Sequence, residues 1–269
     1  ILDTPGHKDF AEDTFRTLTA VDSVIVVIDV AKGVEEQTEK LVEVCRMREI
    51  PIIVFINKLD REGKDAFDLL EKKLKFSVCP LSFPIGVGYD FQGIYNIWEN
   101  NLMLFEDENK QKISQTINIT SINDPRLIEF IGENASKKIK EEVEIVKEIY
   151  PKFNQLDYLE CKQQPVFFGS ALNNFGVKEL LDCFVSIAPS PLSKESEERI
   201  INPSEDRFSG FVFKIHANMD PKHRDRLAFI KIVSGIFKRN KPYHHVRINK
   251  NFKFSSPNAF FAEKKEIIE

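Results

Sequence analysis

The chain has 269 residues, 42% of them hydrophobic, which is enough for one large domain and part of a second. Its formal net charge of -4 gives no overall basic character, although a local patch could still face nucleic acid. Its four cysteines are far apart and form no CxxC pair, which argues against a zinc site or a disulfide framework. No apolar run approaches the roughly 20 residues that span a bilayer, and no signal-type segment opens the chain. These features predict a cytoplasmic protein with no membrane partner.

Two short runs rich in Val and Ile, "VDSVIVVIDV" at 21–30 and "PIIVFINKLD" at 51–60, predict parallel strands buried on both faces. The segment between them, "EEQTEKLVEVCRMRE" at 35–49, carries Leu41, Val44, Cys45 and Arg48 at helical spacing. A strand, helix, strand unit is therefore expected over 21–60.

A third apolar run, "QPVFFGSAL" at 164–172, precedes "NNFGVKELLDCFVSIAPSP", in which apolar residues line one face of a helix that stops at Pro189. The alternation of strands and helices predicts a doubly wound α/β sheet. Between 61 and 164 the pattern loosens into loop, short strand and helix. We expect this stretch to be an insertion on the edge of the sheet.

The polar, proline-containing stretch at 191–206 has no periodic apolar face and is expected to be a linker between a domain at 1–190 and a second domain. From 207 to 269, strand-like runs alternate with Gly, Pro and Asn. This pattern predicts the start of an all-β barrel. About 60 residues are few for a closed barrel, so the barrel is expected to be partial.

Ligands of open α/β sheets bind beyond the carboxyl ends of the strands. The first such end is "DTPGH" at 3–7, where Asp3 could hold a magnesium ion through water and Gly6 could bring its N–H close to a terminal phosphate. His7 could position an attacking water, or could instead cap a helix or pack in the core. A DxxG pattern alone is weak, so a second strand end has to decide between these readings.

That second end is "NKLD" at 57–60. The carboxylate of Asp60 can accept two parallel hydrogen bonds from N1–H and the exocyclic amine of guanine, which adenine does not offer. Asn57 would support the loop, and the aliphatic part of Lys58 would cover the base. In isolation these four residues would suit an ordinary surface loop, but "SAL" at 170–172 ends a later strand and favours the nucleotide interpretation.

The three strand ends resemble the third, fourth and fifth motifs of the translational GTPases, in which histidine follows the glycine of "DTPGH". The stretches at 7–41 and 209–235 are similar to the release factor three group of bacteria, and "ANMDPKHRDR" is the most specific of them. The resemblance implies a P-loop-NTPase-type α/β domain that binds GTP or GDP with Mg2+. It further implies nucleotide contacts from the following residues: Asp3, Thr4, Pro5, Gly6, His7, Asn57, Lys58, Leu59, Asp60, Ser170, Ala171 and Leu172.

The resemblance also implies a function: GTP hydrolysis, with His7 as the catalytic residue, that drives class I release factors off the ribosome after termination. The expected partners are ribosomal RNA, ribosomal proteins and class I release factors, with no DNA. The charged turn that holds Lys222, His223, Arg224 and Arg226 is either a solvated hairpin loop or a contact with phosphates or a partner.

The sequence contains neither the GxxxxGK[ST] loop nor a switch threonine, both of which precede "DTPGH" in the family. We therefore expect a fragment that lacks the N-terminal part of its GTPase domain and is inactive alone, within an active full-length protein. Two alternatives stay open: another translational GTPase of the translocase or ribosome-protection type, and a non-catalytic ribosome-binding module.

Overall fold

The computed structural model describes residues 1–4, 11–105, 113–217, 226–261 and 264–267. The chain divides into two compact units, Ile1–Ser190 and Pro191–Glu269. No helix in the described part of the chain is long and apolar enough to cross a membrane.

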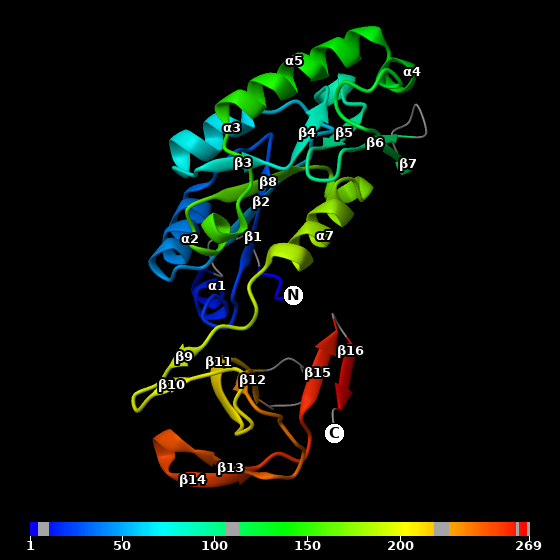
Figure 1. Ribbon diagram of the computed structural model, residues 1–269. Coiled ribbons are helices and arrows are strands. Elements are labelled where there is room, and N and C mark those ends of the chain that lie inside the picture. The colour runs from blue at the N-terminus through cyan, green and yellow to red at the C-terminus, as the bar shows by residue number, and fades with distance from the viewer. Residues whose placement is uncertain (5–10, 106–112, 218–225, 262–263, 268–269) are drawn as a thin grey trace. The chain divides into compact units, whose positions relative to one another are not determined.

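A four-stranded parallel sheet forms the centre of the first unit, in the order β1-β2-β8-β3 (Figure 1). Its strands are β1 (Val24–Asp29), β2 (Ile52–Asn57), β8 (Gln164–Phe168) and β3 (Val78–Pro80). Helix α2 (Glu36–Met47) joins β1 to β2 and α7 (Val177–Ile187) follows β8, as the sequence pattern predicts.

Alternate residues of β2 pack into two different cores, which shows why this strand carries no polar residue until Asn57. Ile52, Val54 and Ile56 lie in the cluster that contains Val42 and Cys45 of α2. Ile53 and Phe55 lie in the cluster that contains Leu180, Cys183 and Ile187 of α7. Helices therefore cover both faces of the sheet, and the doubly wound prediction is confirmed.

The first unit also contains several short helices and turns. They are α1 (Ala11–Thr17), α3 (Ala66–Asp68), the π-helical turn η2 (Leu69–Lys73), α6 (Gln155–Leu159), and the 3-10 turns η3 (Gly88–Asp90) and η4 (Ala171–Asn173). Asp65 caps α3 by accepting hydrogen bonds from the N–H groups of Phe67 and Asp68, at 2.9 and 3.1 Å.

The range 61–164, expected as an insertion, holds two different structures. Strand β3 belongs to the main sheet, where it pairs with β8. The rest includes an antiparallel sheet of β4 (Ser82–Ile85), β5 (Gly93–Asn96), β6 (Asn101–Phe105) and β7 (Ile113–Asn118). Helices α4 (Leu127–Ile131) and α5 (Glu133–Ile149) lie beside this sheet (Figure 1). Their buried apolar residues belong to the same core cluster as those of the sheet.

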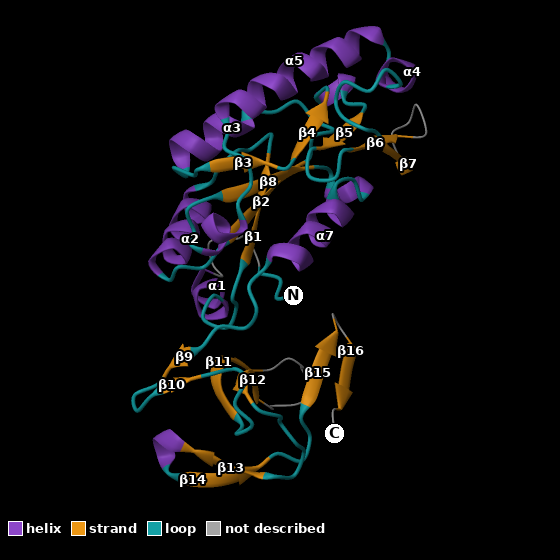
Figure 2. Cartoon of the chain, viewed as in Figure 1, coloured by secondary structure: helices purple, strands orange, loops and turns teal. Residues whose placement is uncertain are grey.

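The second unit is rich in β-structure, apart from one 3-10 turn, η5 (Val246–Ile248) (Figure 2). Its described strands form four separate pairs: β9 (Lys194–Glu195) with β10 (Ile200–Ile201), β11 (Ser209–Ala217) with β12 (Arg226–Ser234), β13 (Pro242–His245) with β14 (Lys250–Lys253), and β15 (Asn258–Phe261) with β16 (Lys264–Ile267). The predicted linker thus contains a small hairpin. After the hairpin, the carboxylate of Glu205 accepts hydrogen bonds from both guanidinium NH2 groups of Arg199, at 2.7 Å each.

Candidate nucleotide site at the carboxyl ends of the strands

Strands β1 and β2 end side by side. Their register pairs Asp29 with Asn57, and the N–H of Val30 then donates to the carbonyl of Asn57 at 3.0 Å. Because the carboxyl ends of parallel strands meet at one edge of a sheet, the loops that follow β1, β2 and β8 gather there.

The amide of Asn57 connects two of these loops. Its Oδ1 accepts the N–H of Lys58 at 2.9 Å and the N–H of Ala171 at 2.8 Å. Lys58 has a φ of 69°, the left-handed region, so the chain turns sharply directly after the strand. Asn57 therefore supports the loop, as the sequence predicts, and fixes its position against the end of β8.

Leu59 points into the protein. Its side chain is 2% exposed, its N–H donates to the carbonyl of Gly169 at 3.2 Å, and its carbonyl accepts the N–H of Gly88 at 3.2 Å. Within "NKLD", Leu59 is thus the residue that anchors the loop in the core, and its buried side chain is not exposed to a ligand.

Asp60 lies against Ser170, although 110 residues separate them. The Ser170 hydroxyl donates to Oδ1 of Asp60 at 2.7 Å and accepts a hydrogen bond from Nδ2 of Asn173 at 3.2 Å. Ser170 is fully buried, whereas the side chain of Asp60 keeps 25% of its surface exposed. The carboxylate is therefore held by Ser170 on one side, while its Oδ2 stays partly exposed and lies 4.0 Å from Nε of Arg61.

The close approach of Ser170 to Asp60 depends on the absence of a side chain at Gly169. A Cβ on Gly169 would lie 2.2 Å from the carbonyl oxygen of Phe175 and 2.6 Å from the ring of Phe55. Ser170 and Phe175 exchange backbone hydrogen bonds of 3.0 and 2.9 Å, which closes the turn after β8. The turn that carries Ser170 is therefore closed by its own backbone hydrogen bonds.

Asp29 belongs to the same edge and was missed in the sequence analysis. Its Oδ2 accepts Nζ of Lys58 at 2.5 Å, and its Oδ1 accepts the N–H of Ala31 at 3.0 Å and of Lys32 at 3.3 Å. Partial burial acts to raise the pKa of Asp29, but the hydrogen bonds from Lys58, Lys32 and Ala31 outweigh it and lower the pKa below its ordinary value. The signal was present, because "VIDV" ends an apolar strand on an acid as "ILD" does.

The remaining predicted site residues divide into two groups. Ala171 and Leu172 are exposed beside the Asp60 loop, Leu172 to 84%. Asp3 is exposed and Thr4 half-buried, while Pro5, Gly6 and His7 lie outside the described residues.

Ile1–Thr4 has no strand structure, so the expectation that Asp3 ends a strand is wrong for this structure. In physical terms, a strand needs a neighbour to pair its backbone groups, and neither Ile1 nor Leu2 is buried. Within the described residues no three His, Cys, Asp or Glu side chains gather closely enough to hold a metal ion.

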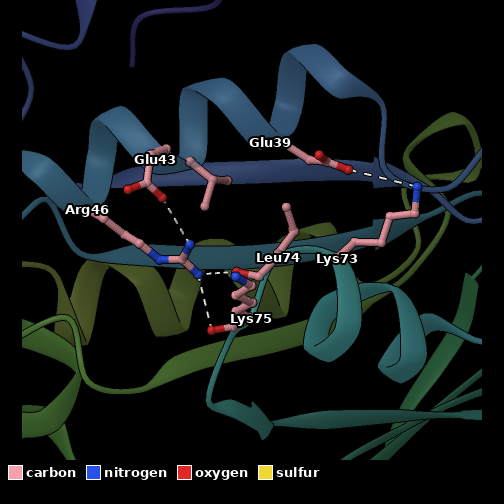
Figure 3. Close-up of a pocket in the computed structure, with 7 residues that line it drawn as sticks. Glu39, Glu43, Arg46, Lys73, Leu74 and Lys75 are labelled. Atoms are coloured by element: carbon pink, nitrogen blue, oxygen red, sulfur yellow. Dashed lines mark hydrogen bonds and ion pairs between the residues drawn. The ribbon is translucent and has the colours of Figure 1, made fainter.

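A separate pocket of about 210 Å³ lies between α2 and the segment after η2 (Figure 3). Arg46 spans it, donating to the carbonyls of Leu74 and Lys75 and pairing with Glu43 at 3.4 Å, while Lys73 lies 3.9 Å from Glu39. Because Arg46 is in the last turn of α2, just before β2 begins, this pocket is at the opposite edge of the sheet from Asp60. The ion pairs and hydrogen bonds of these side chains hold α2 against the segment that follows η2.

The doubly wound sheet with amide and carboxylate side chains at its strand ends defines a nucleotide-binding α/β protein. The family model of the Elongation factor Tu GTP binding domain matches residues 1–190, and that of Elongation factor G domain 2 matches residues 207–269. The chain therefore belongs to the translational GTPases, a family of GTP-binding proteins that act with the ribosome.

Proposed function

We propose that the loop edge formed by Asn57, Asp60 and Ser170 binds the guanine base of GTP and GDP. The observation that carries this proposal is the Ser170 to Asp60 hydrogen bond. It occupies one acceptor position of the carboxylate, which has about four. The partly exposed side of Asp60, where Nε of Arg61 lies 4.0 Å from Oδ2, would accept the two adjacent donors of guanine. A base without those donors would desolvate the carboxylate without pairing it, at a cost of about 1–3 kcal/mol or more.

Lys58 would lie beside the same base. Its backbone turn and its ion pair with Asp29 hold the start of the side chain at the strand edge. The aliphatic part of Lys58 would then cover one face of the ring, and the exposed Ala171 and Leu172 would border the site.

In this proposal the "DTPGH" segment binds the phosphates and the metal ion and supports hydrolysis. Asp3 would bind Mg2+ through water, the N–H of Gly6 would meet the terminal phosphate, and His7 would orient the attacking water. The metal would neutralise charge that develops on the phosphate oxygens. The exposed carboxylate of Asp3 suits an ion reached through water, and family membership supports the whole assignment.

We further propose that the protein acts after termination, as a release factor three that promotes dissociation of class I release factors from the ribosome. The similarity of the stretches at 7–41 and 209–235 supports this choice within the family. Residues 218–225, which join β11 to β12, lie outside the described part of the chain, so the roles of Lys222, His223 and Arg224 stay predictions. Arg226 is exposed at the start of β12.

The test measures loss of a fluorescent class I release factor from ribosomes after peptide release, with the intact protein and GTP or a non-hydrolysable analogue. GTP-dependent acceleration is expected. His7→Ala should lower the ribosome-stimulated hydrolysis rate by about 10²-fold with nearly unchanged GTP affinity. Activity in translocation instead would assign the protein to the translocase type, and binding of ribosomes without hydrolysis would make it a non-catalytic module.

A further inference from the structure

The turn between β4 and β5 contacts both loops of the nucleotide edge, although it lies within the range expected as an insertion. This turn, residues 86–92, joins two paired strands and includes η3. The N–H of its Gly88 donates to the carbonyl of Leu59 at 3.2 Å, and Leu59 directly precedes Asp60. The turn therefore reaches the loop after β2 through its backbone.

The same turn reaches the loop after β8 through an aromatic pair. The rings of Phe91 and Phe175 lie edge to face, with their centroids 5.6 Å apart, and both side chains are fully buried in the cluster that also contains Leu59. Phe175 exchanges two backbone hydrogen bonds with Ser170, at 3.0 and 2.9 Å. Phe175 therefore links Phe91 to the serine whose hydroxyl binds Asp60.

The conformation of the turn depends on its own hydrogen bonds and on glycine. The N–H of Phe91 donates to the carbonyl of Gly88 at 3.3 Å. Gly86 has a φ of +76°, and a Cβ there would lie 2.1 Å from the carbonyl oxygen of Asp90. Any side chain at Gly86 would displace the turn, and the Phe91 ring with it.

We propose that Phe91 is a positioning residue of the guanine site, which sets the place of Ser170 relative to Asp60 by packing against Phe175. This inference rests on the proposed function, since it assigns the Asp60 carboxylate to the base. A carboxylate that accepts two adjacent donors needs both oxygens in place, whereas a single hydrogen bond tolerates a small rotation. Loss of the Phe91 ring would let the loop after β8 move and the carboxylate turn, so the second contact with the base would weaken most.

The experiment compares the binding of GDP and IDP to the intact protein by isothermal titration. The base of IDP has N1–H and lacks the exocyclic amine, so the ratio of the two affinities reports the second contact with Asp60. The variant is Phe91→Leu, and Phe91→Met, whose unbranched side chain fills gaps, is a second variant in case the first does not fold. Phe76→Leu is the matched control, because Phe76 is buried in the same cluster but lies beside Arg46, at the opposite edge of the sheet.

We expect the preference for GDP over IDP to fall by about three- to tenfold in the Phe91 variants, because a hydrogen bond to a charged group is weakened. Phe76→Leu should keep the preference of the unmodified protein. An unchanged preference in the folded Phe91 variants, or an equal fall in the control, would overturn the proposal.

A second measurement does not depend on the nucleotide. Amide hydrogen exchange without ligand follows the N–H of Ala171, which donates to Asn57, and the N–H of Phe175, which donates to Ser170. Both should exchange about threefold or more faster in the Phe91 variants than in the control. If the unmodified protein binds GDP and IDP equally well, the assignment of Asp60 to the base fails, and the exchange rates then test the positioning alone. Equal rates in the variants and the control would overturn it.

Discussion

The hydroxyl of Ser170 donates to a carboxylate oxygen of Asp60 at 2.7 Å, joining the loop after β8 to the loop after β2. A fully buried serine thereby fixes the one acidic side chain that we assign to the base. This relationship brings the predicted fourth and fifth motif segments together, and it depends on the hydroxyl of Ser170.

Ser170→Ala in the intact protein should weaken GDP binding by about 10- to 100-fold, because a hydrogen bond to a charged group contributes about 1.5–3 kcal/mol. Isothermal titration with GDP measures the change. Ser186→Ala is the matched control, since that exposed hydroxyl bonds a carbonyl within α7. If both variants bind GDP equally well, Ser170 does not orient Asp60.

Gly169→Ala should destabilise the protein by more than about 2 kcal/mol, because the new Cβ would lie 2.2 Å from the Phe175 carbonyl and force the loop to move. Gly132→Ala serves as a comparison, since its φ of +81° is strained but nothing lies within 4 Å of the added carbon. Thermal unfolding should show the larger loss for Gly169→Ala. A smaller loss there than for Gly132→Ala would mean that the loop accommodates the methyl group.

The Asp29–Lys58 pair should contribute pH-dependent stability. The pKa of Asp29 is lowered in the folded state, so the contribution is present above the unfolded pKa of about 3.9 and is lost as pH falls through the folded value. Asp29→Asn should lower the free energy of unfolding by about 0.5–1 kcal/mol at pH 7 and by less near pH 3.

Urea unfolding at several pH values checks this, with Asp182→Asn as control, because Asp182 pairs with Lys178 on the exposed face of α7. The control should change stability little at any pH. A loss for Asp29→Asn that does not shrink towards pH 3 would show that the carboxylate acts through packing.

Ser136→Ala should leave the stability unchanged or raise it by about 1 kcal/mol. The Ser136 side chain is 1% exposed in α5, and its Oγ has no hydrogen-bond partner in the structure, so burial of this hydroxyl is uncompensated. Asn134→Ala, at an exposed position of the same helix, has a similar gain in helix propensity without that burial. Calorimetry should rank Ser136→Ala as the more stabilising change; a clear loss would indicate a bonded hydroxyl.

Local pattern was enough to predict α2, α7 and the three long parallel strands, because their apolar residues follow one period and are bounded by turn residues. The antiparallel sheet from β4 to β7 was read as loop and short strand, since four-residue strands such as Gly93–Asn96 are stabilised by their neighbours. Asn57, Asp60 and Ser170 were predicted from strand ends. Their pairing, and that of Asp29 with Lys58, depends on strand order, which no local pattern encodes.

The most direct test of the central claim exchanges Asp60 for Asn in the intact protein and measures competition between GTP and XTP for binding. The amide replaces an acceptor with a donor facing the base, so preference should move from guanosine towards xanthosine nucleotides. Glu62→Gln, which removes a neighbouring exposed carboxylate, should keep the preference for GTP. An unchanged preference for GTP in Asp60→Asn would contradict the assignment of this strand edge to the base.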